Sequence, residues 1–462
     1  MTDELITISP IDGREVVRRA YASEAQVAHA LASAQAAQGA WHAMGIEARG
    51  RVVSDAVDRF VAAKDEIARA ITIQMGRPLR YTPSEVAGFE ARARHMIAIA
   101  PEALAPIPAP AQPGYTRFIS REPIGVALTI APWNYPLLTA VNSIVPALMA
   151  GNSVILKHSD QTPLCAELIG RAFRDAGAPA GVFQFLHASH DIAQRLIRAP
   201  EIGYVSFTGS VRGGRSVEEG AAGRFIGVGL ELGGNDPAYV RADARLDHAI
   251  ETLVDGAFFN SGQSCCGIQR IYVARARYDE FIERAVALTN QYVLGNPLDA
   301  ETTLGPVVRN RAAAEIRDVI QEAIAAGARN MIDSSHFKNA SEGSPYVAPA
   351  LLTQVDHRMR IMNDECFGPV VGIMPVETDE QAVALMNDSP YGLTAAVFTQ
   401  DEDAALHIGR QVRTGTFFMN RCDYLDPALA WTGVKNSGRG VSLSAVGFEP
   451  LTQAKSFHLR SV

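Results

Sequence analysis

The sequence predicts an α/β protein of at least two domains, built around a parallel sheet. The chain has 462 residues with ordinary globular composition, 47% hydrophobic and 20% charged, and is too long for one compact core. Between residues 123 and 232, short apolar runs alternate with amphipathic stretches, which is typical of parallel strands joined by crossover helices. Residues 247–326 continue this style, so we expect a second α/β domain.

The N-terminal part predicts two helices, over residues 23–44 and 47–75. Both segments are rich in alanine, have apolar residues at helical spacing and contain no proline. Residues 101–113 are rich in proline, which a helix interior does not tolerate. We therefore expect an edge hairpin there.

The expected strands of the first sheet are the apolar runs at 126–130, 154–156, 182–186, 204–207 and 225–230. One of the intervening helices begins at Thr162-Pro163, where Thr suits the N-cap and Pro the first helical position. A nucleotide site is expected at the carboxyl ends of these strands.

In the second half we expect helices near residues 247–259, 278–289 and 312–326 and a strand near 268–273. The alternating residues 456–460 suit an edge strand that pairs with another subunit.

Charge and hydropathy exclude several classes of protein. The formal net charge is -8, with no long basic run, so no nucleic-acid partner is expected. Residues 1–10 lack the pattern of a signal peptide, and the apolar stretches fall short of the roughly 20 residues that span a bilayer. The sequence thus predicts a soluble, cytoplasmic protein with no membrane partner. Its cysteines are few, odd in number and without paired spacing, which favours free thiols.

Three stretches carry residues suited to catalysis. In residues 258–266 a glycine-loosened turn presents Cys265 after a predicted helix, although taken alone a buried loop cysteine is the more common outcome. Glu231 ends an apolar strand just before a double glycine, where desolvation would raise its pKa as a general base requires. Asn134 lies between two prolines that fix the backbone, so its amide suits an oxyanion donor.

In this order along the chain, these stretches resemble the aldehyde dehydrogenase superfamily, whose signatures include an N-x-G-Q-x-C loop and an E-L-G-G segment. The resemblance covers nearly the whole chain, and the opening residues 9–13 and the length are similar to the shorter members, including the semialdehyde dehydrogenase branch. Further matching motifs are Leu156-Lys157 with Gln161-Thr162-Pro163-Leu164, Phe207-Thr208-Gly209-Ser210, Glu365-Cys366-Phe367-Gly368-Pro369 and Lys435-Asn436-Ser437-Gly438.

The resemblance implies a mechanism. Cys265 takes the position of the nucleophile that attacks the aldehyde carbon, and Cys266 is its neighbour. The Asn134 amide and the Cys265 backbone N–H would hold the thiohemiacetal oxygen. Glu231 would activate the water that hydrolyses the thioester. No residue is assigned to a metal.

The resemblance also implies a cofactor, NAD, with NADP possible. Lys157 matches the residue that binds the adenosine ribose, and Glu365 the one that binds the nicotinamide ribose. The motif neighbours Trp133 and Phe367 are expected beside the cofactor, together with Gly209, Ser210 and Gly214 at a helix N-terminus that suits the pyrophosphate. Without its neighbours in the motif, Lys157 would be interpreted as a solvated charge on the surface. Glu365 would likewise be interpreted as a surface acid.

Two departures from the family pattern bear on specificity. Asp160 stands three residues after Lys157, where many relatives have the longer Glu. An acid there repels a 2′-phosphate, which favours NAD. The usual Pro-Phe-Gly-Gly run becomes Ala430-Trp431-Thr432-Gly433 at the expected mouth of the substrate channel.

The family fold implies three parts and an oligomer. Residues 1–231 are expected to form a Rossmann-like NAD(P)-binding domain with an oligomerisation excursion near 102–122, residues 232–438 the catalytic domain, and residues 439–462 an oligomerisation tail. A homodimer or homotetramer is expected.

The expected substrate is a small uncharged aldehyde, apolar or aromatic. By register with the family, the channel is lined mostly by neutral residues, namely Leu138, Thr139, Asn142, Ser264, Tyr424, Leu425 and Trp431. The aromatic side chains of Tyr424 and Trp431 could instead pack a domain interface. Arg421, close to the same loop, leaves open a carboxylate-bearing substrate such as succinate semialdehyde.

Three other classes compete with a hydrolytic dehydrogenase. CoA-acylating members and phosphate-activated semialdehyde reductases have no need for the base at Glu231. A catalytically silent homologue would usually have lost the thiol, the amide or the base, and all three are present here.

Overall fold

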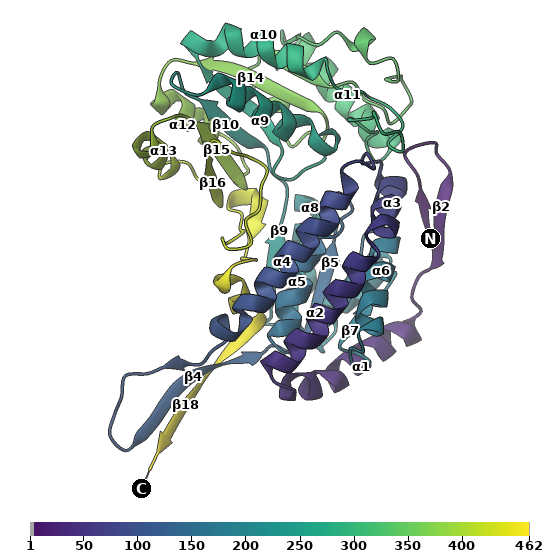
Figure 1. Ribbon diagram of the computed structural model, residues 1–462, viewed down its shortest axis with the longest axis vertical. Coiled ribbons are helices and arrows are strands. Elements are labelled where there is room, and N and C mark those ends of the chain that lie inside the picture. The colour runs from purple at the N-terminus through teal and green to yellow at the C-terminus, as the bar shows by residue number, and fades with distance from the viewer. Residues whose placement is uncertain (1–3, 462) are drawn as a thin grey trace.

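The computed structural model describes residues 4–461, which form two parallel-stranded sheets with helices on both faces and a projecting arm (Figure 1). The α/β prediction is therefore confirmed. A hairpin of β1 (Glu4–Ile8) and β2 (Glu15–Ala20) opens the described part of the chain. Within residues 4–461 no helix combines the length and apolar character that a membrane span requires.

The first sheet has six strands in the order β17-β9-β8-β5-β6-β7. All neighbours are parallel except β17, which runs antiparallel along the edge beside β9. The five expected strands are present, although the last begins at residue 227 because Phe225 is fully exposed in a left-handed conformation. The strands are β5 (Val126–Ala131), β6 (Ser153–His158), β7 (Phe183–Phe185), β8 (Ile202–Thr208), β9 (Gly227–Glu231) and β17 (Gly438–Arg439).

Helices cover both faces of this sheet because successive residues of a strand point to opposite sides. Ala127 of β5 packs into the core cluster formed by α2 to α6, whereas Val126 and Leu128 pack against α1, α7 and α8. The helices are α1 (Glu24–Ala43), α2 (Ile46–Ala62), α3 (Lys64–Met75), α4 (Thr82–Ala103), α5 (Leu138–Met149), α6 (Pro163–Asp175), α7 (His190–Arg198) and α8 (Val211–Ala221).

Two helix predictions need correction. The single helix expected over 47–75 is broken at Ala63, whose backbone lies outside the helical region, and becomes α2 and α3. Helix α4 was not predicted, and it runs through Pro101 in its last turn, where the proline removes one backbone hydrogen bond close to the helix end. The expected helix start at Thr162-Pro163 is confirmed, but the Thr162 hydroxyl contacts His158 and does not cap the helix.

The second sheet has seven strands in the order β12-β13-β14-β11-β10-β15-β16, and only β12 is antiparallel to its neighbour. Two buried clusters lie on its two faces. Its strands are β10 (Asp236–Val240), β11 (Ile268–Ala274), β12 (Arg329–Asn330), β13 (Ala350–Thr353), β14 (Val370–Val376), β15 (Thr394–Phe398) and β16 (Thr416–Met419). Its helices are α9 (Leu246–Phe258), α10 (Tyr278–Thr289), α11 (Asn310–Ala325), α12 (Asp379–Asn387) and α13 (Glu402–Gly409).

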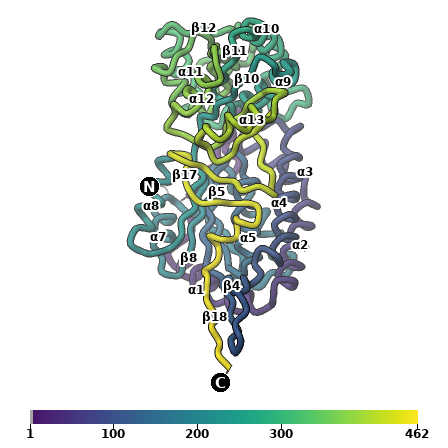
Figure 2. Tube along the Cα trace, turned by 90° about the vertical axis from the view of Figure 1, so that its left-hand side faces the viewer, coloured from purple at the N-terminus to yellow at the C-terminus, as the bar shows by residue number. Residues whose placement is uncertain are grey.

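The arm is a three-stranded antiparallel sheet of β3 (Ile107–Pro108), β4 (Tyr115–Pro123) and β18 (Thr452–Arg460). Strand β18 pairs with β4 over its full length, and the rings of Phe118 and Phe457 stack with centroids 4.7 Å apart. Figure 2 shows the C-terminal strand beside β4, extending away from the body. The expected hairpin near 101–113 is present but begins at residue 107, because residues 101–103 still belong to α4. The expected strand at 456–460 is confirmed, but it pairs with β4 of the same chain, whereas we expected it to pair with another subunit.

Candidate active site

The carboxyl edge of the six-stranded sheet brings together residues that are far apart in the sequence. In β5, Ile130 is paired with Lys157 on one side and Phe207 on the other, and Asn134 follows this strand within four residues. Thr208 at the end of β8 is paired with Glu231 at the end of β9. Parallel strands thus bring Asn134, Lys157 and Glu231 to one edge of the sheet.

The loop of residues 258–266, the Cys265 loop, owes its shape to three successive left-handed residues. Asn260, Ser261 and Gly262 have φ angles of 55°, 57° and 69°. A Cβ at Gly262 would overlap the Gly368 carbonyl, so only glycine fits there. Gln263 then fixes the turn, because its Nε2 donates to the Asn260 carbonyl at 3.0 Å and its Oε1 accepts from the Val308 N–H at 2.8 Å.

The two adjacent cysteines differ in their surroundings. Both line the wall of one cavity, in which Cys265 is partly exposed and Cys266 is buried. The Cys266 Sγ donates to Asp423 Oδ1 at 2.9 Å, and the Ser264 hydroxyl donates to the same oxygen at 3.1 Å. The pKa of Cys266 is raised well above its usual range, first by a hydrogen bond with the Cys265 thiol and second by burial. Cys266 therefore stays a protonated donor, and Cys265 is the thiol that a ligand can reach.

Two N–H donors are available near Cys265. The backbone N–H of Cys265 makes no hydrogen bond within the described residues. The Asn134 side chain is buried and its Nδ2 donates to the Gln263 carbonyl at 3.1 Å, which occupies one of its two hydrogens. One hydrogen on each group remains for an oxyanion.

Glu231 has two hydroxyl partners that the sequence did not suggest as partners. Ser442 donates to Oε1, and Thr208 donates to Oε2 at 3.5 Å. Burial raises the pKa of Glu231, although the Ser442 hydrogen bond and the charge of Arg92 act in the opposite direction. A carboxyl with a raised pKa near a thiol is suited to proton transfer at neutral pH.

A cavity of about 670 Å³ contains Cys265 and Glu231 in its wall. Of the seven predicted channel residues, Leu138, Thr139, Asn142, Tyr424, Leu425 and Trp431 line it, and Ser264 instead faces Asp423. Charged residues that the sequence analysis did not assign also line it, namely Arg77, Glu85, Arg92, Glu251, Asp255 and Asp423. Arg421, the alternative substrate contact, lies at the cavity with its guanidinium carbon 3.3 Å from the centre of the Tyr424 ring.

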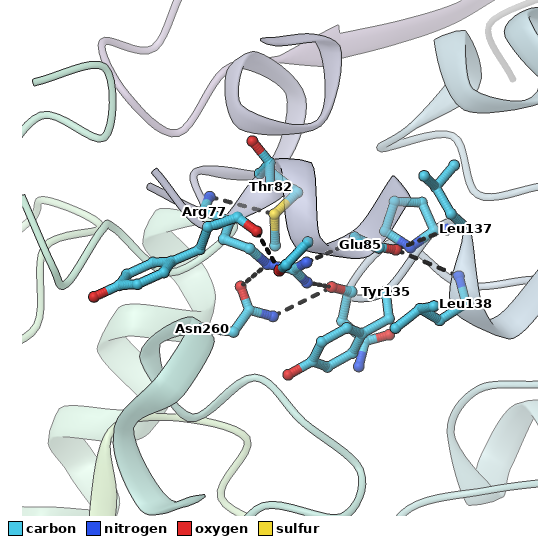
Figure 3. A network of polar contacts seen from close by, with 12 residues as sticks. Arg77, Thr82, Glu85, Tyr135, Leu137, Leu138 and Asn260 are labelled. Atoms are coloured by element: carbon cyan, nitrogen blue, oxygen red, sulfur yellow. Dashed lines mark hydrogen bonds and ion pairs between the residues drawn. The ribbon is translucent and has the colours of Figure 1, made fainter. Parts of the chain in front are cut away.

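A buried ion pair between Arg77 and Glu85 supports both halves of this site (Figure 3). The Arg77 guanidinium also donates to Asn260 Oδ1 at 3.0 Å and to the Asn134 carbonyl. The Glu85 carboxylate accepts from the Leu137 N–H at 2.8 Å, at the N-terminus of α5. The pair therefore connects the Cys265 loop, the Asn134 turn and the start of α5.

The predicted cofactor residues form an edge that fits a dinucleotide. Glu365 is largely buried, accepts from the Gly234 N–H at 3.0 Å through Oε1, and has no partner for Oε2 among residues 4–461. Burial raises the pKa of Glu365 to about 7. The free Oε2 of Glu365 suits a ribose hydroxyl, and Lys157 Nζ is a donor at the same sheet edge. The residues present therefore fit a dinucleotide cofactor.

The other predicted cofactor residues lie around this edge. Lys157 Nζ is 3.1 Å from Asp160 Oδ1, and the Tyr21 hydroxyl donates to Asp160 Oδ2 at 2.8 Å. Ser210 caps α8 through the Gly213 N–H, and a Cβ at Gly214 would crowd Leu232. The rings of Trp133 and Phe367 meet edge to face with centroids 5.7 Å apart. Gly209 completes the turn between β8 and α8, where its backbone N–H donates to the Glu231 carbonyl.

Comparison with known proteins defines the class. The sequence profile of the aldehyde dehydrogenase family matches residues 2–457. The chain therefore belongs to the aldehyde dehydrogenase family and is an oxidoreductase.

Individual relatives agree with this assignment. The chain is 34% identical to the NAD(P)+ succinate semialdehyde dehydrogenase Sad of Escherichia coli, over 96% of this chain and 95% of that protein. It is 33% identical to a 3,6-anhydro-alpha-L-galactose dehydrogenase of Streptomyces coelicolor, over 99% of this chain and 93% of the relative. Its fold matches a betaine aldehyde dehydrogenase of Staphylococcus aureus in complex with NAD+ at a TM-score of 0.93, with 28% identity, over 99% and 92% of the two chains.

We predict that Arg77→Met lowers the free energy of unfolding by about 3–5 kcal/mol, because it leaves the buried Glu85 carboxylate without its counter-ion. Urea unfolding measures this loss. Arg80→Met is the matched control, since Arg80 is exposed three residues away and should change stability by only about 0.5 kcal/mol. Equal losses in the two variants would contradict the structural role of the pair.

Proposed function

We propose that the protein oxidises an aldehyde to a carboxylic acid with Cys265 as the nucleophile and Glu231 as the general base. The proposal rests on one observation. Cys265 is the reachable thiol of a cavity whose wall also contains Glu231, and the backbone N–H of Cys265 makes no hydrogen bond within the described residues. These are the groups that thioester chemistry requires.

The proposed steps use the residues in sequence. The Cys265 thiol releases its proton to solvent as its sulfur attacks the aldehyde carbon, and the new oxyanion accepts from Asn134 Nδ2 and the Cys265 N–H. NAD(P)+, when bound, would supply the hydride acceptor for oxidation of this thiohemiacetal to a thioester. Glu231 then takes a proton from a water molecule, whose oxygen attacks the thioester carbon. The acid leaves, and the proton returns to the Cys265 sulfur.

The cofactor is proposed to bind along the carboxyl edge of the six-stranded sheet. Lys157 and Glu365 would hold the two riboses, and the N-terminus of α8 behind Ser210 would face the pyrophosphate. Asp160 lies beside Lys157, so its charge opposes a 2′-phosphate and favours NAD over NADP.

The organisation proposed for the chain follows the same roles. Residues 1–231 would hold the cofactor, residues 232–438 the nucleophile, and residues 439–462 would serve oligomerisation. Strand β18 is an edge strand of the arm. Its outer edge, unpaired among the described strands, is available for a second subunit in a homodimer or homotetramer. A cytoplasmic location is part of the same proposal.

Hydrolysis is favoured over transfer to CoA because Glu231 is present and held by Ser442 and Thr208. A CoA-acylating enzyme or a phosphate-activated reductase has no use for a base there. NADH absorbance after addition of an aldehyde, with and without CoA, separates these classes. NADH formation that requires CoA would overturn the hydrolytic assignment.

The choice of aldehyde depends on the charged groups in the cavity. An apolar or aromatic aldehyde suits Leu138, Leu425 and Trp431, but it would leave the buried Arg92 without a polar partner from the ligand. A carboxylate-bearing aldehyde satisfies that guanidinium. We therefore favour the carboxylate-bearing class, with Arg92 in place of Arg421 as the main contact.

Cys265→Ala should abolish dehydrogenase turnover, because the other two thiols in the wall of the described cavity, Cys266 and Cys422, are buried. Cys266→Ala should keep turnover within about tenfold of the parent enzyme, since Cys266 is a protonated donor to Asp423. Steady-state NADH formation measures both. An inactive Cys266 variant beside an active Cys265 variant would show that the roles are reversed.

Glu231→Gln should give a burst of one NADH per active site followed by slow turnover, because the thioester forms but is hydrolysed poorly. In the parent enzyme, burial raises the pKa of Glu231, so turnover should fall as the pH drops through a pKa above the ordinary carboxyl range. The variant should lose this acid limb. Glu218→Gln, an exposed acid on α8, is the control and should show neither effect. Unchanged steady-state turnover in Glu231→Gln would rule out the base role.

The parent enzyme should have a higher kcat/KM with NAD than with NADP, and Asp160→Ser should improve kcat/KM with NADP because it removes a negative charge beside Lys157. Initial rates with each cofactor measure the ratio. Asp175→Ser, which removes an exposed acid, should leave it unchanged. If the Asp160 variant gains nothing with NADP, the carboxylate does not face the 2′ position.

A further inference from the structure

Arg92 is a buried cation in the wall of the proposed substrate cavity. It lies on α4 and is only 8% exposed. Its Nη1 donates to the Leu138 carbonyl at 3.0 Å and to Asn142 Oδ1 at 3.1 Å, so α5 holds the guanidinium in place. Nε and Nη2 have no hydrogen-bond partner among residues 4–461, yet they are not sealed from solvent, which leaves them open to the cavity.

Asn142 adds a donor to the same wall. Because its Oδ1 accepts from Arg92, its Nδ2 is turned away from the guanidinium. This nitrogen likewise has no partner within the described residues and is not sealed from solvent. The wall therefore presents several N–H donors and no competing acceptor from these two side chains.

The charge of Arg92 is not neutralised by direct contact. No carboxylate of residues 4–461 lies within ion-pair distance of it, and the nearby Glu85 is already paired with Arg77. Burial lowers the pKa of Arg92, while the charges of Glu231, Cys266, Glu85 and Cys265 oppose that change. A buried guanidinium without a counter-ion is costly unless a ligand supplies one.

We propose that Arg92, held by Asn142, binds a carboxylate of the aldehyde substrate. The inference rests on the proposed function and names its substrate class. A guanidinium with two free N–H donors matches the two oxygens of a carboxylate in a planar, charge-assisted contact. Since Arg92 shares the cavity with Cys265 and Glu231, an aldehyde anchored here has its carbonyl in the cavity of the nucleophile.

The other charges of the cavity help to orient such a substrate. Glu251 and Asp255 come from α9, and Asp423, which feels the charge of Asp255, lies on the Cys266 side. The negative charges of these acids disfavour a substrate carboxylate on the side of the cavity where they lie. Arg421, the other free cation among the described cavity residues, is exposed and stacked on Tyr424, so it is less suited to hold a desolvated anion.

The test compares succinate semialdehyde with pentanal, a neutral aldehyde of similar length. The parent enzyme should prefer the semialdehyde. In Arg92→Gln the ratio of the two kcat/KM values should fall by about tenfold to a hundredfold, as expected for loss of a hydrogen bond to a charged group. The ratio is independent of the amount of folded enzyme, so partial misfolding of the variant does not obscure it.

Matched variants separate binding from other effects. Arg92→Lys keeps the charge without the fork and should recover part of the preference. Arg94→Gln, an exposed residue on the same helix that pairs with Asp58 and Glu90, should leave the ratio unchanged. If Arg92 instead tuned Cys265 or Glu231 electrostatically, both aldehydes would lose equally and the pH profile would shift, which would overturn the proposal.

Two further outcomes would also overturn it. A parent enzyme that oxidises pentanal as well as the semialdehyde has no carboxylate subsite, although the proposed dehydrogenase function stands. A preference for the semialdehyde that Arg421→Gln removes and Arg92→Gln keeps would place the subsite at the cavity mouth. Failure of the proposed function itself looks different, because then neither aldehyde would yield NADH.

Discussion

The buried ion pair between Arg77 and Glu85 is the contact on which the geometry around Cys265 and Asn134 depends. Removing two charges from water is costly, and this pair is stable because hydrogen bonds saturate both partners. Glu85 places negative charge at the N-terminus of α5, where the helix dipole favours it, and Arg77 reaches the Asn134 carbonyl and the Asn260 amide. The Asn134 turn and the Cys265 loop, more than a hundred residues apart, are thus held by the same ion pair.

Much of the fold was predictable from the sequence because local patterns determine it. The apolar runs of the first sheet became strands, and the C-terminal alternation became β18. The residues of the Cys265 loop were recognisable by type, and the structure gives the physical reason: Gly262 occupies a left-handed position where a side chain would overlap Gly368. The break at Ala63 was hidden because alanine fits both a helix interior and its end.

The rest of the site could not be predicted because it depends on contacts between distant segments. Ser442 donates to Glu231 across 211 positions, and Arg92 meets Asn142 across 50. Nothing in the local sequence distinguishes Arg92 from the other arginines of the same amphipathic helix. The ends of that helix carry no clear sequence signal either. Neutral residues near the family motifs suggested an apolar channel, whereas the fold turns charged residues from α4 and α9 into the same cavity.

The edge strand β17 has a consequence for how the enzyme can diversify. The chain that leaves β17 passes Glu231, where it contributes Ser442, and then continues into β18 of the arm. Ser442, the hydroxyl partner of Glu231, and the outer strand of the arm therefore lie on one short stretch of polypeptide. Recombination between relatives in the segment between β4 and β17 would transfer Ser442 and β18 together, and it would separate β18 from the β3 and β4 strands with which it forms the arm.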